Sequence, residues 1–140
     1  EERKLKKLET TTELANLIVN CTPHIKSSIH PATRVFQAIR IEVNQELTNV
    51  KNTLNDVLDL LGFGAIISVI SFHSLEDRIV KNLFKYHAAR CHCEKNQMIC
   101  TCPPPKLELV NKKPIIASEE EIKLNPPSRS AKLRIAKCIN

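Results

Sequence analysis

The chain has 140 residues, only two of them glycine, and a formal net charge of +6 with a pI near 9.1. Because Gly62 and Gly64 are the only glycines, the chain has neither a G-x-G-x-x-G turn nor a G-x-x-x-x-G-K-[ST] loop, which excludes a glycine-rich phosphate cradle of its own. The positive charge favours a polyanion, RNA or DNA, over a membrane as partner, although an ordinary basic surface has the same composition.

The amino-terminal part is predicted to be helical. Residues 10–13 read Thr-Thr-Thr-Glu, a capping box for a short helix that ends at Pro23, and residues 27–31 are turn-like. From Phe36 to Leu61 apolar residues recur at steps of three and four. This spacing predicts one amphipathic helix of about seven turns, which Gly62 and Gly64 end.

The rest of the chain alternates strand and helix signals. Residues 65–70 are a β-branched run that predicts a strand buried on both faces of a parallel sheet, and Ser74-x-x-Asp77 is predicted to cap the helix that follows. Residues 91–105, rich in cysteine and proline, are predicted to be irregular. Strand material over 106–116 (broken near Asn111 and Pro114), a short helix after Ser118 and a last strand over 131–139 complete an α/β fold.

A polar row borders the apolar stripe of the long predicted helix. Thr33, Gln37, Arg40 and Asn44 fall within a sector of roughly 60° at 100° per residue. One cation and two amides at a partly shielded position suit a base edge or a phosphate. The alternative is a helix border whose polar side chains bond to a neighbouring loop.

The turn after the buried strand is a second candidate site. Ser71, His73 and Ser74 lie where the carboxyl end of a strand meets a helix N-terminus, a place where α/β sheets bind ligands and anions. His73 is also placed for acid–base work. The alternative is structural, with Ser74 and Asp77 as caps and the nitrogens of a packed His73 satisfied.

Cysteines and basic residues supply the remaining candidates. Cys91, Cys93, Cys100 and Cys102 could hold zinc, although C-x-C is tighter than the usual C-x-x-C, and reduced thiols in a loop are the alternative. In the tail, Arg129, Lys132 and Arg134 could follow a phosphate backbone or line a solvated edge strand.

The sequence shows no recognisable targeting signal, and we therefore expect a cytoplasmic protein. The first residues lack the apolar core of a signal peptide, and the longest apolar run, Leu60 to Ile70, is shorter than the roughly 18 residues of a membrane helix. Six cysteines without a secretory segment indicate a reducing compartment. Because the chain does not begin with Met, we expect it to be an excerpt of a longer protein.

Three segments resemble the signature motifs of one known family, both in sequence and in their order along the chain. They are His30–Leu47 (HPATRVFQAIRIEVNQEL), Val69–Lys81 (VISFHSLEDRIVK), and the carboxyl-terminal SEEEI and RSAKLR around Asn125-Pro126. They are similar to the signatures of the bacterial ribosomal RNA small-subunit methyltransferase H family, and the resemblance covers most of residues 29–136. It implies S-adenosylmethionine-dependent methylation of the N4 amine of a cytosine in 16S rRNA, at the decoding centre.

The resemblance also implies a domain organisation. Residues 1–28 would be the end of a helical insertion domain, and residues 29–140 the carboxyl half of a class I, Rossmann-like methyltransferase sheet. The family's Gly-Gly-His-Ser cofactor loop, its ribose-binding acid and its Asp-x-Gly-x-Ser-Ser segment are missing, so no cofactor-binding residue is expected in this chain. The family's cysteine loop varies in spacing, which argues against a metal needed for activity.

Site roles follow from motif and position together. Ser71, His73 and Ser74 are expected to line the pocket, and RNA contacts are expected from Arg34, Gln37, Arg40, Asn44, Arg78, Lys132 and Arg134. The expected partner is 16S rRNA in the small ribosomal subunit, with homodimer formation left open. The competing interpretation is a non-catalytic, stand-alone module that binds RNA or zinc.

Overall fold

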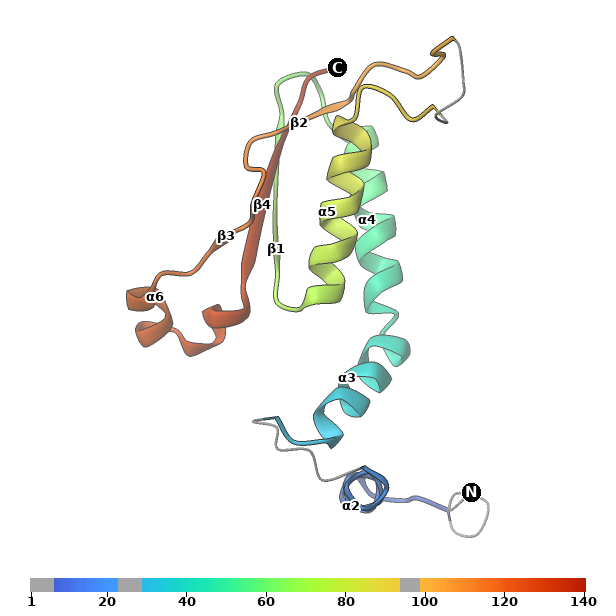
Figure 1. Cartoon of the computed structure of the whole chain (residues 1–140), viewed down its shortest axis with the longest axis vertical. Helices are drawn as coiled ribbons and strands as arrows, with labels where there is room; N and C mark the ends of the chain where they lie inside the picture. The colour runs from blue at the N-terminus through green and yellow to red at the C-terminus, as the bar shows by residue number, and fades with distance from the viewer. Residues whose placement is uncertain (1–6, 23–28, 94–98) are drawn as a thin grey trace. The chain divides into compact units, whose positions relative to one another are not determined.

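The computed structural model describes residues 7–22, 29–93 and 99–140, and the chain divides into two compact units, Glu1–Glu46 and Leu47–Asn140 (Figure 1). In the first unit, α2 (Thr11–Cys21) begins with a capping box that confirms the predicted helix. The Thr10 hydroxyl accepts from the Glu13 N–H at 3.1 Å, and the Glu13 carboxylate accepts from the Thr10 N–H at 3.1 Å. The predicted stop at Pro23 and the turn at Ser27 and Ser28 lie outside the described residues.

The long helix predicted from Phe36 to Leu61 is wrong, because the segment forms two helices. α3 (Ala32–Val43) belongs to the first unit, and α4 (Glu46–Leu60) belongs to the second from Leu47 onward. Between them Gln45 adopts a left-handed φ of 53°, and its side-chain amide donates to the Glu42 carbonyl at 2.7 Å. A left-handed residue stops the helical hydrogen bonding while leaving the apolar spacing intact, so periodicity did not reveal the break.

The second unit is built on a small antiparallel sheet. Its order is β1 (Ile66–Ser71), β4 (Lys132–Cys138) and β2 (Leu107–Leu109), and β3 (Ile115–Ile116) also pairs with β4. β1 and β4 align Ile66 with Lys137 and Ser71 with Lys132. The predicted parallel pairing is therefore wrong among the described residues, while the predicted last strand and the break near Asn111 and Pro114 are confirmed.

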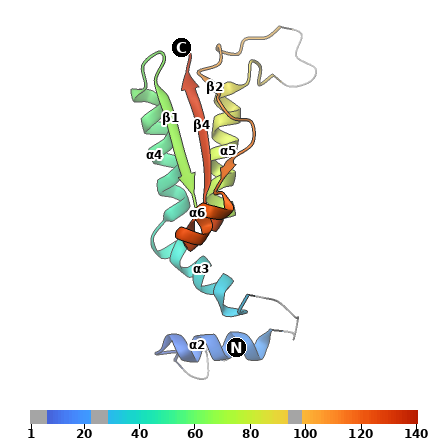
Figure 2. The same ribbon diagram turned by 90° about the vertical axis from the view of Figure 1, so that its left-hand side faces the viewer.

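One face of this sheet carries the core. α4 and α5 (Ser74–Ala88) lie together against it (Figure 2). The buried cluster takes residues from every layer: Leu54, Leu58, Ile67, Val80, Phe84, Leu107, Ala136 and Cys138. On the opposite face Ile66 and Ile70 are 64% and 60% exposed, so the prediction of a strand buried on both faces is wrong within this chain.

Short connections complete the unit. Gly64, with a φ of 83°, turns the chain from α4 into β1 and donates its N–H to the Cys138 carbonyl at 2.8 Å. Ser118 caps the short α6 (Glu119–Leu124), as predicted, and η1 (Pro126–Ser130) leads into β4. None of the helices in the described part of the chain is long and apolar enough to cross a membrane.

Candidate functional site

The turn between β1 and α5 is organised by His73, which is the N-cap of α5. Its Nδ1 accepts from the Glu76 N–H at 3.4 Å, and its Nε2 lies 3.3 Å from the Glu76 carboxylate. That carboxylate also accepts from the N–H groups of Phe72 (3.0 Å) and His73 (3.3 Å). The predicted cap of Ser74 with Asp77 is therefore wrong, because the capping box lies one residue earlier.

This geometry gives the predicted pocket residues different surroundings. Ser71 is buried at the end of β1, whereas Ser74 is exposed in the first turn of α5. Both ring nitrogens of His73 face Glu76, so the histidine orders the turn instead of offering a free base. The three residues are neighbours at the carboxyl end of a strand, as predicted.

Asp77 joins α5 to the sheet through a buried ion pair. Arg134 of β4 donates to both carboxylate oxygens, from Nε at 2.7 Å and from Nη2 at 3.1 Å, and the Lys132 ammonium lies 3.8 Å away. The two hydrogen bonds from Arg134 hold the pKa of Asp77 below its ordinary value, against the opposing effect of burial. Because its guanidinium is engaged and only 8% of the residue is exposed, Arg134 is a structural residue, and we leave it out of the RNA surface.

The polar row predicted in the first unit lies on α3, with Asn44 as its C-cap. Glu46 engages two of its members: Arg40 lies 2.8 Å from this carboxylate, and the Asn44 amide donates to it at 3.2 Å. Arg34 and Arg40 remain solvent-exposed, and Gln37 is half-buried. The row thus lies on the surface, and the Glu46 carboxylate offsets the positive charge of Arg40 near its carboxyl end.

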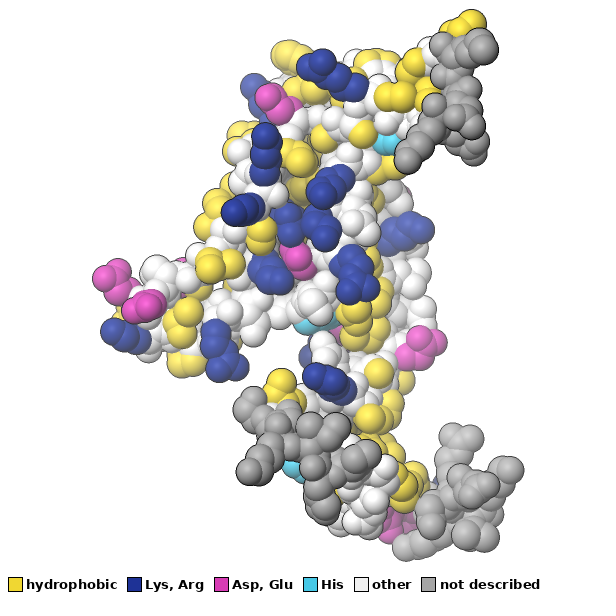
Figure 3. Space-filling model, in the orientation of Figure 1, with side chains coloured by type: hydrophobic (Ala, Val, Ile, Leu, Met, Phe, Trp, Pro, Cys, Tyr) yellow, Lys and Arg dark blue, Asp and Glu magenta, His cyan; other side chains and the backbone are white. Residues whose placement is uncertain are grey.

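A basic surface gathers on the second unit beside α5 (Figure 3), and it includes three lysines that the sequence analysis did not single out, Lys81, Lys85 and Lys112. Lys81, Lys85, Lys112 and Arg134 line one small depression together with Phe84 and Asn111. Lys81 and Lys85 are four residues apart and so share one face of α5, a spacing that could have identified them. Arg78, exposed one turn earlier, and the partly exposed Lys132 lie on the same unit. Cations concentrated in this way suit phosphate oxygens.

The cysteine loop contains the densest group of potential metal ligands among the described residues. The Sγ atoms of Cys91, Cys93, Cys100 and Cys102 all lie within 4.8 Å of one another. Hydrogen bonds from the neighbouring thiols raise the pKa of Cys93 to about 12. A bound divalent cation would reverse this effect, since it stabilises the thiolates.

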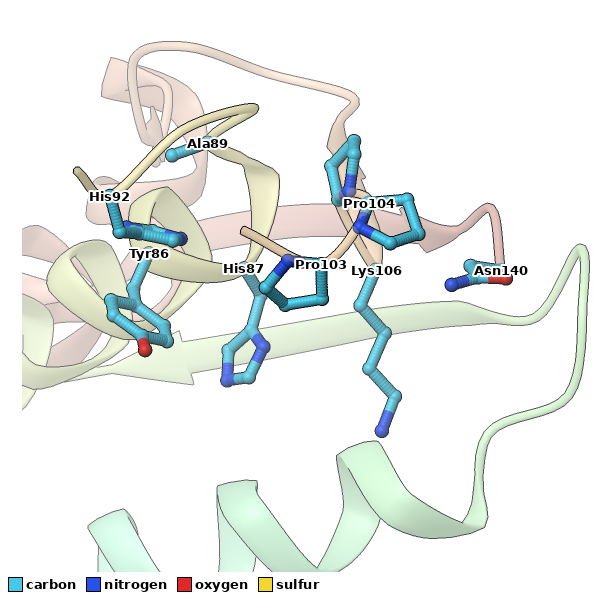
Figure 4. Close-up of a pocket in the computed structure, with 9 residues that line it drawn as sticks. Tyr86, His87, Ala89, His92, Pro103, Pro104, Lys106 and Asn140 are labelled. Atoms are coloured by element: carbon cyan, nitrogen blue, oxygen red, sulfur yellow. The ribbon is translucent and has the colours of Figure 1, made fainter. Parts of the chain in front are cut away.

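A pocket of about 520 Å³ opens beside this loop (Figure 4). Tyr86 and His92 stack at its rim with ring centroids 4.1 Å apart, and Pro103, His87 and Lys106 contribute to its lining. Burial lowers the pKa of His87, and the charge of Lys106 lowers it further, against the opposing effect of the Asp59 carboxylate. The pocket is therefore lined jointly by α5 and by the segment that returns to β2.

The second unit thus combines helices with an antiparallel sheet and carries a face on which cations gather. The chain belongs to the MraW methylase family, whose model matches residues 1–139, and this confirms the resemblance seen in the sequence. It is 53% identical, over 97% of its length, to the ribosomal RNA small subunit methyltransferase H of Caldicellulosiruptor bescii, and 49% identical over 99% to that of Clostridioides difficile. The chain spans 45% and 46% of those two proteins, less than half of each.

Proposed function

We propose that the chain is the carboxyl part of an enzyme that methylates the N4 amine of a cytosine in 16S rRNA, with S-adenosylmethionine as methyl donor. The observation that carries this proposal is identity of about one half, sustained over nearly the whole chain, to proteins named ribosomal RNA small subunit methyltransferase H. A match over residues 1–139 disfavours a stand-alone RNA- or zinc-binding module. A cytoplasmic location accords with this function, and homodimer formation stays a prediction.

The open side of the sheet supports the assignment to part of a larger class I domain. Among the described strands β1 pairs only with β4, which leaves its other edge available to a further strand. Ile66 and Ile70 lie on the exposed face, where isoleucines at this exposure favour a covering layer. We assign residues 29–140 to the carboxyl half of that domain and residues 1–28 to the end of a helical insertion.

We propose that S-adenosylmethionine is held mainly by residues outside this chain. Gly62 and Gly64 are its only glycines, so it has no glycine-rich loop that could hold a phosphate or a dinucleotide. The proposal therefore assigns the cofactor to a part of the enzyme outside this chain, and we derive no step through it.

The role proposed for this chain is to hold the RNA. A cytosine must leave its stack before its N4 amine is accessible, and the flanking backbone must be held while it does so. Lysines beside α5 suit this task, with Lys81, Lys85 and Lys112 lining one depression. Arg78 and Lys132 extend the proposed surface, and Arg34, Gln37, Arg40 and Asn44 of α3 form a second one. Ser71, His73 and Ser74 are proposed to shape the turn below the extruded base.

The test uses the complete enzyme that contains this chain. Transfer of a labelled methyl group to 16S rRNA is measured for the wild type, the double variant Lys81→Ala/Lys85→Ala and a control, Lys123→Ala, in the exposed part of α6. We expect the double variant to raise KM for the RNA and to lower the salt dependence of binding, since two phosphate contacts are lost, while the control is unchanged. An enzyme that transfers no methyl group to the cytosine amine would refute the function. An active enzyme with an unaffected double variant would refute only the RNA surface.

A further inference from the structure

The loop after α5 brings two short cysteine pairs together. Cys91 and Cys93 leave the helix, and Cys100 and Cys102 return towards β2. The Sγ atoms of Cys93 and Cys102 are 3.4 Å apart, and those of Cys91 and Cys100 are 3.7 Å apart. Four sulfurs around a zinc ion at about 2.3 Å form a tetrahedron with edges of about 3.8 Å. The thiols thus converge at the spacing of a tetrathiolate site.

Burial does not explain why these side chains converge. Cys91 and Cys100 are exposed, and Cys93 and Cys102 are only partly buried. Thiol groups are weak hydrogen-bond donors and acceptors, so hydrogen bonds among the four thiols contribute little stability. Disulfide-bonded sulfurs would lie about 2.05 Å apart, and all four cysteines are free. A soft cation between the sulfurs would supply the missing attraction.

The backbone around the cluster is arranged to stabilise negative sulfur. The His92 N–H donates to the Cys102 Sγ at 3.1 Å, and the Cys93 N–H donates to the Cys91 Sγ at 3.3 Å. Hydrogen bonds to ligand atoms orient them and stabilise their charge, as in established metal sites. The turn formed by Cys91, His92 and Cys93 serves both cysteine pairs, because its two amides reach one sulfur of each.

We propose that Cys91, Cys93, Cys100 and Cys102 bind one zinc ion in a closed, structural site. Thiolate ligands select soft or borderline metals, and a tetrahedral set of four sulfurs is the geometry of structural zinc. Four protein ligands leave no open coordination position, so the ion organises the loop and takes no part in methyl transfer. This proposal does not rest on the proposed methyltransferase function.

The zinc ion would fix one wall of the pocket in Figure 4. His92 lies between two ligands and stacks on Tyr86 of α5, and Pro103 directly follows the ligand Cys102. Both residues line the pocket. At the base of the loop, the Lys106 N–H donates to the His87 carbonyl at 2.9 Å and joins the returning chain to α5. Metal binding and the shape of this pocket are therefore coupled.

The test is metal analysis of the full chain, purified under reducing conditions without chelator. We expect about one zinc ion per chain, released when a mercurial reagent blocks the thiols. Cobalt substitution should give the intense visible bands of a tetrahedral tetrathiolate. Cys93→Ser and Cys100→Ser should each lose the zinc and the cobalt spectrum, whereas the matched control Cys21→Ser, an exposed thiol on α2, should keep both.

A second measurement follows the loop and does not depend on the folding of the cysteine variants. Removing zinc from the wild-type chain with a chelator should speed tryptic cleavage after Arg90, and adding zinc back should slow it again. Far-ultraviolet circular dichroism of each variant shows whether the helices persist. Absence of zinc and of a cobalt spectrum in the wild type, iron in place of zinc, or intramolecular disulfides in the reduced preparation would each overturn the proposal. Equal zinc content in Cys93→Ser and Cys21→Ser would overturn the ligand assignment.

Discussion

The ion pair between Asp77 and Arg134 connects α5 to β4. Removing the charge of Asp77 should therefore lower the free energy of unfolding of the second unit substantially. Asp77→Asn keeps the volume of the side chain but leaves the Arg134 guanidinium, whose side chain is 9% exposed, without its carboxylate. Breaking a buried pair costs about 3–5 kcal/mol. Because the asparagine oxygen still accepts one hydrogen bond and both side chains retain some solvent contact, we expect a loss of about 3 kcal/mol in the free energy of unfolding.

Urea unfolding followed by circular dichroism measures this loss, and the chain supplies a matched control. Asp59 of α4 also pairs with a cation, Lys106, at 3.0 Å, but its side chain is 82% exposed. Asp59→Asn should therefore change the free energy of unfolding by less than about 1 kcal/mol. Replacing both partners of the buried pair, as in Asp77→Leu with Arg134→Met, should recover most of the stability lost in Asp77→Asn.

The same pair predicts a dependence on pH whose sign is fixed by the direction of the pKa shift. The pKa of Asp77 is lowered on folding from its ordinary value of 3.8, so its stabilising effect is present above that value and is lost as the pH falls through the lower folded pKa. The difference between wild type and Asp77→Asn should therefore shrink below about pH 4. A loss in Asp77→Asn no larger than in Asp59→Asn, at every pH, would refute the reasoning.

Three further predictions test the capping residue, the α3 surface and the open sheet face. His73→Ala removes the N-cap of α5 and should lower the free energy of unfolding by about 1 kcal/mol. His73→Asn should keep most of the wild-type stability, because asparagine also caps helices. Equal losses of stability for the two variants in urea unfolding would contradict the capping role. In the complete enzyme, Arg40→Ala should weaken 16S rRNA binding and reduce the slope of log affinity against log salt by about one, and an unchanged slope would remove Arg40 from the RNA surface. Ile70→Lys should change the stability of this chain by less than about 0.5 kcal/mol, because Ile70 is 60% exposed, but should destabilise the complete enzyme. Equal thermal shifts in the two contexts would contradict a covering layer over β1.

Local signals in the sequence predicted the elements that depend on neighbouring residues. The helix caps at Thr10 and Ser118 follow from residue types within one turn, and the last strand follows from alternating apolar residues over a short stretch. The break at Gln45 escaped prediction because the residue is neither glycine nor asparagine, and the apolar spacing continues across it. His73 escaped as a cap because Ser74 is the stronger cap by residue type.

Long-range partners were beyond prediction from one sequence. Asp77 and Arg134 are 57 positions apart, so the pattern that indicated a cap and an RNA contact carried no sign that the two would neutralise each other. The apolar run of β1 predicted a parallel sheet, but such a run reports burial and carries no information on strand direction, so only the pairing with β4 shows that the strands are antiparallel. The four cysteines were predicted as a set from their spacing, but only the sulfur distances distinguish a tetrahedral group from four separate thiols.

The scarcity of glycine and the open face of the sheet lead to one assignment of roles. The proposed methyltransferase needs a place for its cofactor and a surface for its RNA, and we propose only the second among the described residues, in the lysines that line the depression beside α5. The helical face of the sheet carries the buried core, whereas on the opposite face Ile66 and Ile70 are not covered by any described residue and are mostly exposed. A segment that covered this face and extended the free edge of β1 would lie next to the turn that His73 orders. Under the proposed function, such a segment is the expected place for the cofactor, and Ile70→Lys in the complete enzyme tests whether the segment is there.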